Sequence, residues 1–177
     1  MINAASVIPK MELMLLRHAE AAPAGPKDEL RPLTDAGRRD AELVGRGLDR
    51  LDLVPELVLF SPLLRAKQTA EAVTGGFKGQ RPGMEERTGL GPGATPAEIM
   101  KLLQGAPGRR RVLLVGHQPD LGRLLSFVVS GGSMELEFAL RPGTVCVTEI
   151  DSIPLRSPGR LVLFAPPSTF AGVVNLG

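Results

Sequence analysis

Two histidines stand where apolar runs of the sequence end. His18 follows the run LMLL at 13–16, with Arg17 between them, and His117 follows the run VLLV at 112–115, with one glycine between them. The chain of 177 residues contains no other histidine. Because a random scatter would rarely place both histidines at the same point of two such runs, we expect them to belong to one site.

Two arginines suggest what this site binds. Arg17 directly precedes His18, and Arg65 lies a few residues after a third apolar run, LVLF at 57–60. Guanidinium groups are always charged, and their planar sets of donors match the oxygens of a phosphoryl group. A neutral imidazole is a competent nucleophile near neutral pH. We therefore expect His18 to attack phosphorus while a protonated His117 stabilises charge on the transferring oxygens, with no metal and no other cofactor.

Four apolar runs predict the strands that position these residues. Each has the length and the side chains of a strand that is buried on both faces, which is typical of a parallel sheet. In open α/β sheets, ligands bind at the carboxyl ends of the strands, where several loops meet. The four runs lie at 13–16, 57–60, 112–115 and 161–164.

Helical patterns alternate with these runs. Thr34 is a good N-cap for an amphipathic helix over 35–50. Ser61 can cap a second helix, which a Gly-Gly pair ends. Thr95 opens a capping box for a third helix, and Pro119 lies near the start of a fourth.

The later part of the chain predicts an antiparallel addition to the sheet. The segments MELEFAL at 134–140 and TVCVTEI at 144–150 flank a Pro-Gly turn, as in a hairpin. The segment 74–111 is predicted to hold one short helix and little else. The fold class that we expect is α/β, with three αβα layers around a mostly parallel mixed sheet.

The length favours one domain, which we expect over residues 11–177. We expect residues 1–10 to be a loosely ordered N-terminal extension or an artefact of the start site. They lack the pattern of a secretory signal, and no later run is long enough to cross a bilayer. Cys146 is the only cysteine, so we interpret it as a core thiol and expect a reducing, cytoplasmic setting without membrane attachment.

The charge pattern argues against a nucleic-acid partner. The formal net charge is only +2, and the chain has no Trp or Tyr to stack on bases. We interpret the triplet Arg109–Arg111 as a solvated turn, with a docking surface for an acidic partner as the alternative. Two histidines and one cysteine without ligand-like spacing make a poor set of metal ligands. The sequence leaves the oligomeric state undetermined.

Four motifs, taken in order, resemble those of the histidine phosphatase superfamily, which has the phosphoglycerate mutase-like fold. The resemblance is strongest to its small SixA-type phosphohistidine phosphatases, and it runs from about residue 12 to about residue 129. It implies that His18 becomes phosphorylated, that Arg17 and Arg65 bind the phosphoryl group, and that His117 completes the phosphate pocket. The motifs are LLRHAEA, RPLTDAGRRDA, LFSPLLRAKQTAEAV and LLVGHQPDLG.

Two departures from the family pattern bear on the mechanism. Ala19 replaces a glycine that commonly follows the first histidine, but the inferred role is that of a backbone carbonyl that orients the ring, which alanine also supplies. No general acid can be assigned, although Glu85 and Glu86 lie near the place where one would be sought. A missing acid matters less for a labile P–N bond than for an alkoxide leaving group, which favours phosphohistidine as the substrate.

Several interpretations stay open. Arg31 contacts the substrate or forms a structural ion pair, and we interpret Glu20 as a solvated loop acid rather than an active-site carboxylate. The favoured function is removal of phosphate from a phosphohistidine-bearing signalling or phosphotransfer protein. The alternatives are a broad-specificity phosphomonoesterase or mutase that acts on small molecules, and a silent binding module. The last is disfavoured because all four expected catalytic positions are filled.

Overall fold

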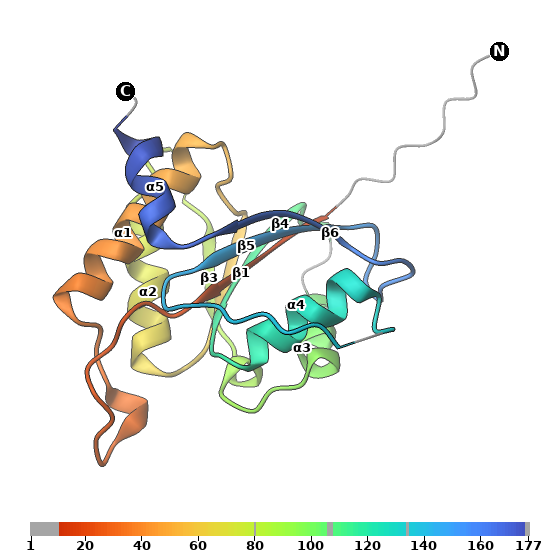
Figure 1. The fold of residues 1–177 in the computed structure, drawn as a ribbon, viewed down its shortest axis with the longest axis horizontal. Coiled ribbons are helices and arrows are strands. Elements are labelled where there is room, and N and C mark those ends of the chain that lie inside the picture. The colour runs from red at the N-terminus through yellow and green to blue at the C-terminus, as the bar shows by residue number, and fades with distance from the viewer. Residues whose placement is uncertain (1–10, 80, 106–107, 134, 176–177) are drawn as a thin grey trace.

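A computed structural model describes residues 11–79, 81–105, 108–133 and 135–175 (Figure 1). The expected N-terminal extension, residues 1–10, lies outside the described residues. The extent of a single domain over 11–177 therefore stays a prediction.

A mixed sheet of six strands forms the centre of the described chain. Its order is β3-β2-β4-β1-β5-β6. β1 pairs in parallel with β4, β4 with β2, and β2 with β3, whereas β5 is antiparallel to both β1 and β6. The strands are β1 (Met11–Arg17), β2 (Leu57–Phe60), β3 (Gly83–Glu86), β4 (Arg111–Gly116), β5 (Val145–Ile150) and β6 (Arg160–Ala165).

Helices cover both faces of the sheet, which confirms the expected αβα layers (Figure 1). One apolar core lies between the sheet and α1 (Asp35–Arg50), α2 (Leu64–Gly75) and α5 (Pro167–Val174). The other lies between the sheet and α3 (Pro96–Leu103) and α4 (Asp120–Ser130), and it contains the buried thiol of Cys146. Two short 3-10 turns, η1 (Asp28–Leu30) and η2 (Thr88–Leu90), lie in the loops. No helix in these described ranges is long and apolar enough to cross a membrane.

Side-chain caps set two of the helix starts as predicted. The Thr34 hydroxyl accepts a hydrogen bond from the Gly37 amide at 3.0 Å, and α1 covers residues 35–50. Thr95 and Glu98 form the predicted capping box of α3. The predicted Ser61 cap is wrong, because α2 begins at Leu64 and the Ser61 hydroxyl instead bonds to a histidine ring.

The run at 161–164 differs from its prediction as a buried strand of a parallel sheet. It forms part of β6, which is antiparallel to β5 and lies at the edge of the sheet. Most of its side chains are exposed. Its apolar composition resembles that of the central strands, so the local pattern did not reveal the edge position.

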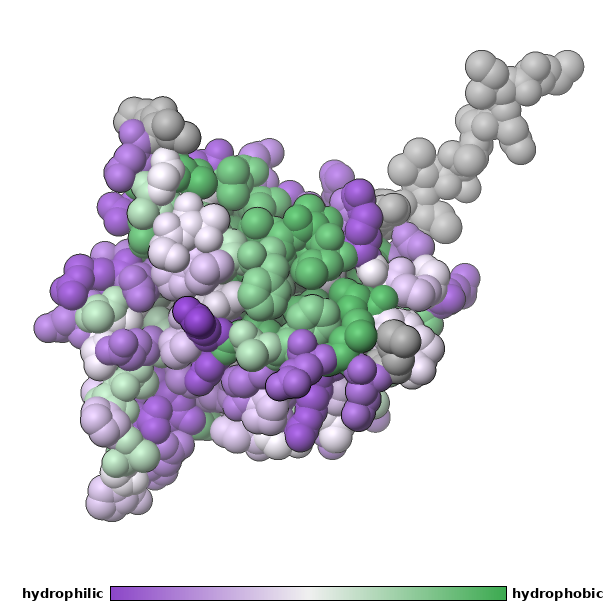
Figure 2. All heavy atoms as spheres, viewed as in Figure 1, coloured by the Kyte–Doolittle hydropathy of each residue, from purple (hydrophilic) through white to green (hydrophobic). Residues whose placement is uncertain are grey.

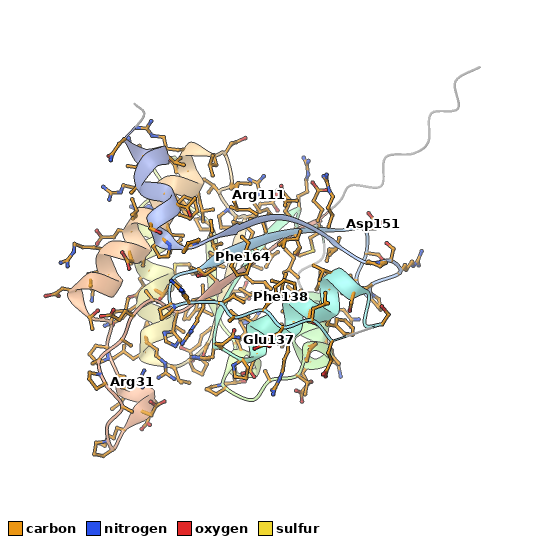
Figure 3. All side chains as sticks on the ribbon, viewed as in Figure 1. Arg31, Arg111, Glu137, Phe138, Asp151 and Phe164 are labelled. Carbon is orange, nitrogen blue, oxygen red and sulfur yellow. The ribbon has the colours of Figure 1, made fainter. Side chains whose placement is uncertain are left out.

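The predicted strand at 134–140 is also wrong for its described residues. Met134 lies outside the described chain, and residues 135–140 have no strand pairing. The carbonyls of this segment bond elsewhere, since that of Phe138 accepts from Gln118 Nε2 at 2.8 Å and that of Leu140 accepts from Arg17 Nη1 at 2.6 Å. We refer to residues 135–140 as the crossing segment, because it passes over the start of α4 (Figure 3).

The region between α2 and β4 contains more structure than predicted. Besides α3 it holds η2 and the edge strand β3, which is short and largely exposed. The sequence reading also missed α5, whose Phe170 packs against Gly47 of α1. β3 and α5 are too short to show a clear hydrophobic period.

Gly37 allows α1 to lie directly on the chain that follows β1. The amide of Thr34 donates to the Glu20 carbonyl at 3.0 Å. A Cβ atom at Gly37 would lie 2.1 Å from that same carbonyl oxygen, which is far inside van der Waals contact. The absence of a side chain here therefore holds the loop after β1 against the first turn of α1.

We expect Gly37→Ala to lower the free energy of unfolding by about 2 kcal/mol. Steric overlap with backbone costs more than the roughly 1 kcal/mol that alanine gains over glycine in a helix. Urea denaturation measures the difference. Gly75→Ala is the matched control, because a Cβ there meets nothing within 4 Å. An equal gain in stability for both variants would contradict the close approach.

Candidate active site

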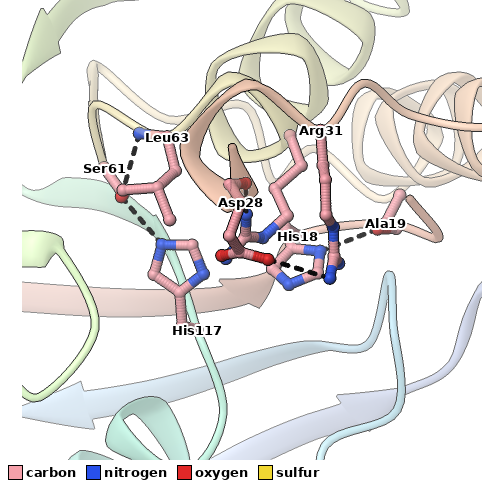
Figure 4. Close-up of polar contacts among 8 residues, drawn as sticks. His18, Ala19, Asp28, Arg31, Ser61, Leu63 and His117 are labelled. Carbon is pink, nitrogen blue, oxygen red and sulfur yellow. Dashed lines mark hydrogen bonds and ion pairs between the residues drawn. The ribbon is translucent and has the colours of Figure 1, made fainter. Parts of the chain in front are cut away.

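The ends of β1 and β4 bring the two histidines together. Arg17 is in register with Gly116, and the His18 amide donates to the Gly116 carbonyl at 2.9 Å. The imidazole rings of His18 and His117 have centroids 5.3 Å apart (Figure 4). Both residues are buried, with 8% and 4% of their surface exposed. The pairing inferred from their positions in the sequence is therefore confirmed.

A hydrogen bond to the next peptide orients the His18 ring. Its Nδ1 lies 2.8 Å from the Ala19 carbonyl oxygen, so a proton on Nδ1 is donated there and Nε2 keeps a free electron pair. The Ala19 amide donates to Thr69 Oγ1 at 3.0 Å, and this hydroxyl donates to the Arg65 carbonyl at 2.7 Å. The predicted carbonyl role of Ala19 is confirmed, and Thr69 ties the Ala19 amide to α2.

Ser61 fixes the second ring. Its hydroxyl lies 2.8 Å from His117 Nε2 and also accepts from the Leu63 amide at 3.3 Å. Nδ1 of His117 is buried and has no hydrogen-bond partner within the described residues. If the Ser61 proton is donated to Nε2, the ring proton lies on Nδ1, and a neutral His117 can still donate into the site.

Asp28 of η1 anchors two arginines at the site (Figure 4). Arg65 is 5% exposed and donates from Nη1 to the Asp28 carbonyl at 2.8 Å and from Nη2 to its carboxylate at 3.1 Å. Arg31 pairs with the other carboxylate oxygen at 3.0 Å. Arg31 thus forms a structural ion pair, which is one of the two roles considered for it from the sequence.

Four buried nitrogens of this cluster have no hydrogen-bond partner within the described chain. Each arginine is anchored through at least one terminal guanidinium nitrogen, Arg17 to the Leu140 carbonyl and Arg31 and Arg65 to Asp28. A cluster of such donors with guanidinium charge suits a tetrahedral oxyanion. The four atoms are Nε of Arg17, Arg31 and Arg65, and Nδ1 of His117.

Burial and positive charge keep both imidazoles neutral. The pKa of His18 is lowered to about 4, chiefly by burial, with the charges of Arg65, Arg17 and Arg31 adding to the effect. Burial and the nearby His18 and Arg65 lower the pKa of His117 to about 3. Neutrality suits His18 as a nucleophile. The expected protonation of His117 concerns the enzyme with a bound phosphoryl group and stays a prediction, whereas burial keeps the ring neutral in this structure.

The carboxylates considered from the sequence lie away from this cluster. Glu20 is exposed and accepts a hydrogen bond from the Thr34 hydroxyl at 2.8 Å, in agreement with its interpretation as a loop acid. Glu85 pairs with Arg87, and Glu86 is exposed on β3. Asp28 is the carboxylate that reaches the arginines.

Asp28, Ser61 and Thr69 are the site residues that sequence reasoning missed. Ser61 was noticed as a helix cap and as a residue that follows the second apolar run, without a role in the site, and Thr69 only as part of a helical pattern. Asp28 lies in a loop rich in Gly and Pro, where no periodicity singles it out. The motif that contains Arg31 begins three residues later, and this proximity was the one available signal.

The arginine triplet lies at the start of β4, at the other end of the strands from the candidate site. Arg109 and Arg110 are exposed, as a solvated turn requires. Arg111 begins β4, pairs with Glu12 and donates to the Asp52 carbonyl at 2.7 Å. It therefore has a structural role that the solvated turn did not include. Within the described ranges no group of three or more His, Cys, Asp or Glu side chains is placed to hold a metal ion.

Comparisons with known proteins agree with this geometry. The family model described as the histidine phosphatase superfamily (branch 1) matches residues 13–110. An uncharacterised protein of Picosynechococcus sp. is 39% identical over 126 residues, which are 68% of this chain and 74% of that protein. Phosphohistidine phosphatase SixA of Escherichia coli K12 is 32% identical over 123 residues, which are 68% of this chain and 76% of that protein. A solved structure of the protein histidine phosphatase SixA complexed with tungstate has a TM-score of 0.79 at 26% identity and covers 90% of this chain and 99% of its own.

We expect an NMR titration to give pKa values of about 4 and about 3 for the two imidazoles, the only ones in the chain. Below the ordinary imidazole pKa of about 6.5, the unfolded chain binds protons that the folded chain does not. The contribution of these groups to the free energy of unfolding should therefore fall as the pH drops from about 6.5 towards 4.

Arg31→Gln should raise the pKa of His18, because the Arg31 charge lowers it. Arg50→Gln at the exposed end of α1 is the matched control and should leave both pKa values unchanged. Imidazole pKa values near 6.5 in the folded protein would contradict the buried cationic pocket.

Proposed function

This chain belongs to branch 1 of the histidine phosphatase superfamily, and from that premise we propose that it hydrolyses phosphohistidine on a protein partner through a phosphorylated His18. The similarity to SixA of Escherichia coli supports this substrate class. The proposal also assigns phosphoryl binding to Arg17, Arg65 and His117.

The observation that carries the proposal is the set of four unpartnered nitrogens beside an oriented, neutral imidazole. Nδ1 of His18 is held by the Ala19 carbonyl, so Nε2 is the atom available to attack phosphorus. The Nε atoms of Arg17, Arg31 and Arg65 then receive the phosphoryl oxygens. Arg31 joins the binding set on this argument, because its Nε is as buried and as unpartnered as the others.

The first step needs no proton transfer when the leaving group is an imidazole. His18 Nε2 forms a bond to phosphorus as the P–N bond of the substrate breaks. A substrate ring that carries a proton on its other nitrogen departs as neutral imidazole, and the Nδ1 proton of His18 stays on its bond to Ala19. One P–N bond replaces another, so no carboxylic acid is required.

In the second step, water attacks the phosphorus of phosphorylated His18. The P–N bond breaks, the electron pair returns to Nε2, and both protons of the water leave with phosphate as its monoanion. The arginines stabilise the oxygens throughout, since their charge does not depend on pH.

The placement of Asp28 favours phosphohistidine over an alkyl phosphate. An alkoxide leaving group needs a proton donor, and Asp28 is the carboxylate nearest the cluster. Both of its oxygens already accept from Arg31 and Arg65, so it is engaged as an anchor. The candidates Glu85 and Glu86 lie on the edge strand β3.

Phosphate release tests the proposal. We expect kcat/KM to be at least about a hundredfold higher for a protein that carries phosphohistidine than for glycerol 2-phosphate, whose alkoxide leaving group needs a proton donor, and also to exceed the value for the aryl ester p-nitrophenyl phosphate. His18→Ala should reduce turnover by roughly a thousandfold or more, and the phosphoenzyme trapped by rapid acid-free quenching should disappear with it. Glu42→Gln, on the exposed side of α1, is the control. Faster turnover of the aryl ester would favour the broad-specificity phosphomonoesterase instead.

Tungstate, which is bound in the solved SixA structure, offers a second test. An oxyanion in the pocket opposes the arginine charges that lower the imidazole pKa values, so binding near pH 6 should take up as much as about one proton. Calorimetry in two buffers of different ionisation enthalpy measures this uptake. His117→Asn should bind tungstate more weakly and take up less, whereas binding without proton uptake would contradict the role of His117.

A further inference from the structure

Exposed apolar side chains gather on one side of the molecule. The described chain has seven large hydrophobic residues that are exposed, and four of them belong to β6 and the crossing segment. Figure 2 shows a continuous apolar area over β6 that extends towards α4. We call this surface the apolar face, and its members are Leu136, Phe138, Leu161, Val162 and Phe164.

The strand register explains why this surface stays uncovered. Phe164 is opposite Cys146, which lies in the core on the α4 side of the sheet. α4 packs on β1 and β5, so the same side of the edge strand β6 is left to the crossing segment. Phe138 packs on Phe164 with ring centroids 6.5 Å apart, yet Phe164 remains 41% exposed and Val162 51%. Apolar patches of this kind mark interaction sites.

The backbone of the crossing segment connects the apolar face to the proposed phosphate site. The carbonyl of Leu140 anchors Arg17, which we assign to phosphoryl binding. The carbonyl of Phe138 accepts from Gln118, the residue after His117. The crossing segment therefore bonds to Arg17 and Gln118 at the candidate site and forms part of the apolar face at once. Its Phe138 lies near Phe164 in Figure 3.

A groove continues this surface along α4. It has a volume of about 860 Å³, and its lining includes Gln118, Phe127 and Phe138. Glu135 and Glu137 line it as well and are exposed. The surface beside the cationic pocket is thus apolar with an acidic border.

We propose that the apolar face is the docking surface for the phosphohistidine-bearing partner, an inference that rests on the proposed function. A histidine side chain is short, and His18 is only 8% exposed, so a folded partner must bring its own surface against the edge of the pocket. The partner that fits carries apolar side chains next to its phosphohistidine and basic side chains that face Glu135 and Glu137.

The experiment compares hydrolysis of the same P–N bond in two substrates. The substrates are free N-phosphohistidine and a folded phosphotransfer protein that carries a single phosphohistidine introduced with phosphoramidate. Val162→Asp and Phe164→Ser should each lower kcat/KM for the protein about tenfold, mainly through KM, and leave free phosphohistidine within about twofold of wild type. Glu135→Lys combined with Glu137→Lys should also raise KM for the protein alone.

Leu51→Asp is the matched control. Leu51 is 43% exposed at the end of α1 and should change neither substrate. The neighbouring Asp52 carbonyl accepts from Arg111 at the start of β4. This end of α1 therefore lies at the other end of the strands from the candidate site. Retained turnover of free phosphohistidine shows that each variant is folded.

Three results would overturn the docking surface while leaving the proposed function intact. The first is unchanged kcat/KM for the protein in both variants, and the second is an equal loss for both substrates. The third is a wild-type dimer that Val162→Asp converts to a monomer with full activity on the protein, which would make the face a contact between two copies. Wild type that hydrolyses free phosphohistidine but not the protein would instead refute the proposed protein substrate, and the docking surface with it.

Discussion

The structure depends on holding three guanidinium groups next to two buried imidazoles. Like charges repel there, and each arginine is therefore tied to an acceptor on the protein. Arg17 bonds to the Leu140 carbonyl, and Asp28 joins Arg31 to Arg65. The same charge, together with burial, keeps the imidazoles neutral and makes the pocket a site for an anion.

The rigid, buried strands of the sheet hold this cluster in place. β1 and β4 are parallel and end side by side. The register between these two strands is therefore enough to place the two histidines next to each other. α2 then supplies Arg65, and its Thr69 accepts from the Ala19 amide, next to the carbonyl that orients His18. His18 and Arg65, the proposed nucleophile and phosphate ligand, are thus coupled through backbone and one buried hydroxyl rather than through flexible side chains.

The crossing segment shows how local patterns and tertiary needs compete. Its alternation of polar and apolar residues predicted a strand, but its carbonyls bond to Arg17 and Gln118 instead of a neighbouring strand. β5 consequently finds its antiparallel partners in β1 and β6. The edge strand that results leaves apolar side chains in solvent beside the pocket, where an ordinary core strand would have buried them.

The sequence alone determined the parallel strands β1, β2 and β4, the helices α1 to α4, and the convergence of Arg17, His18, Arg65 and His117. Short-range periodicity defines buried strands, and parallel strands collect the residues that follow them at one edge. Only the tertiary structure decided the partners that hold these groups. Thr69 lies 50 residues from Ala19, Ser61 lies 56 from His117, and Leu140 lies 123 from Arg17. Such contacts depend on how distant segments pack, which no local pattern encodes.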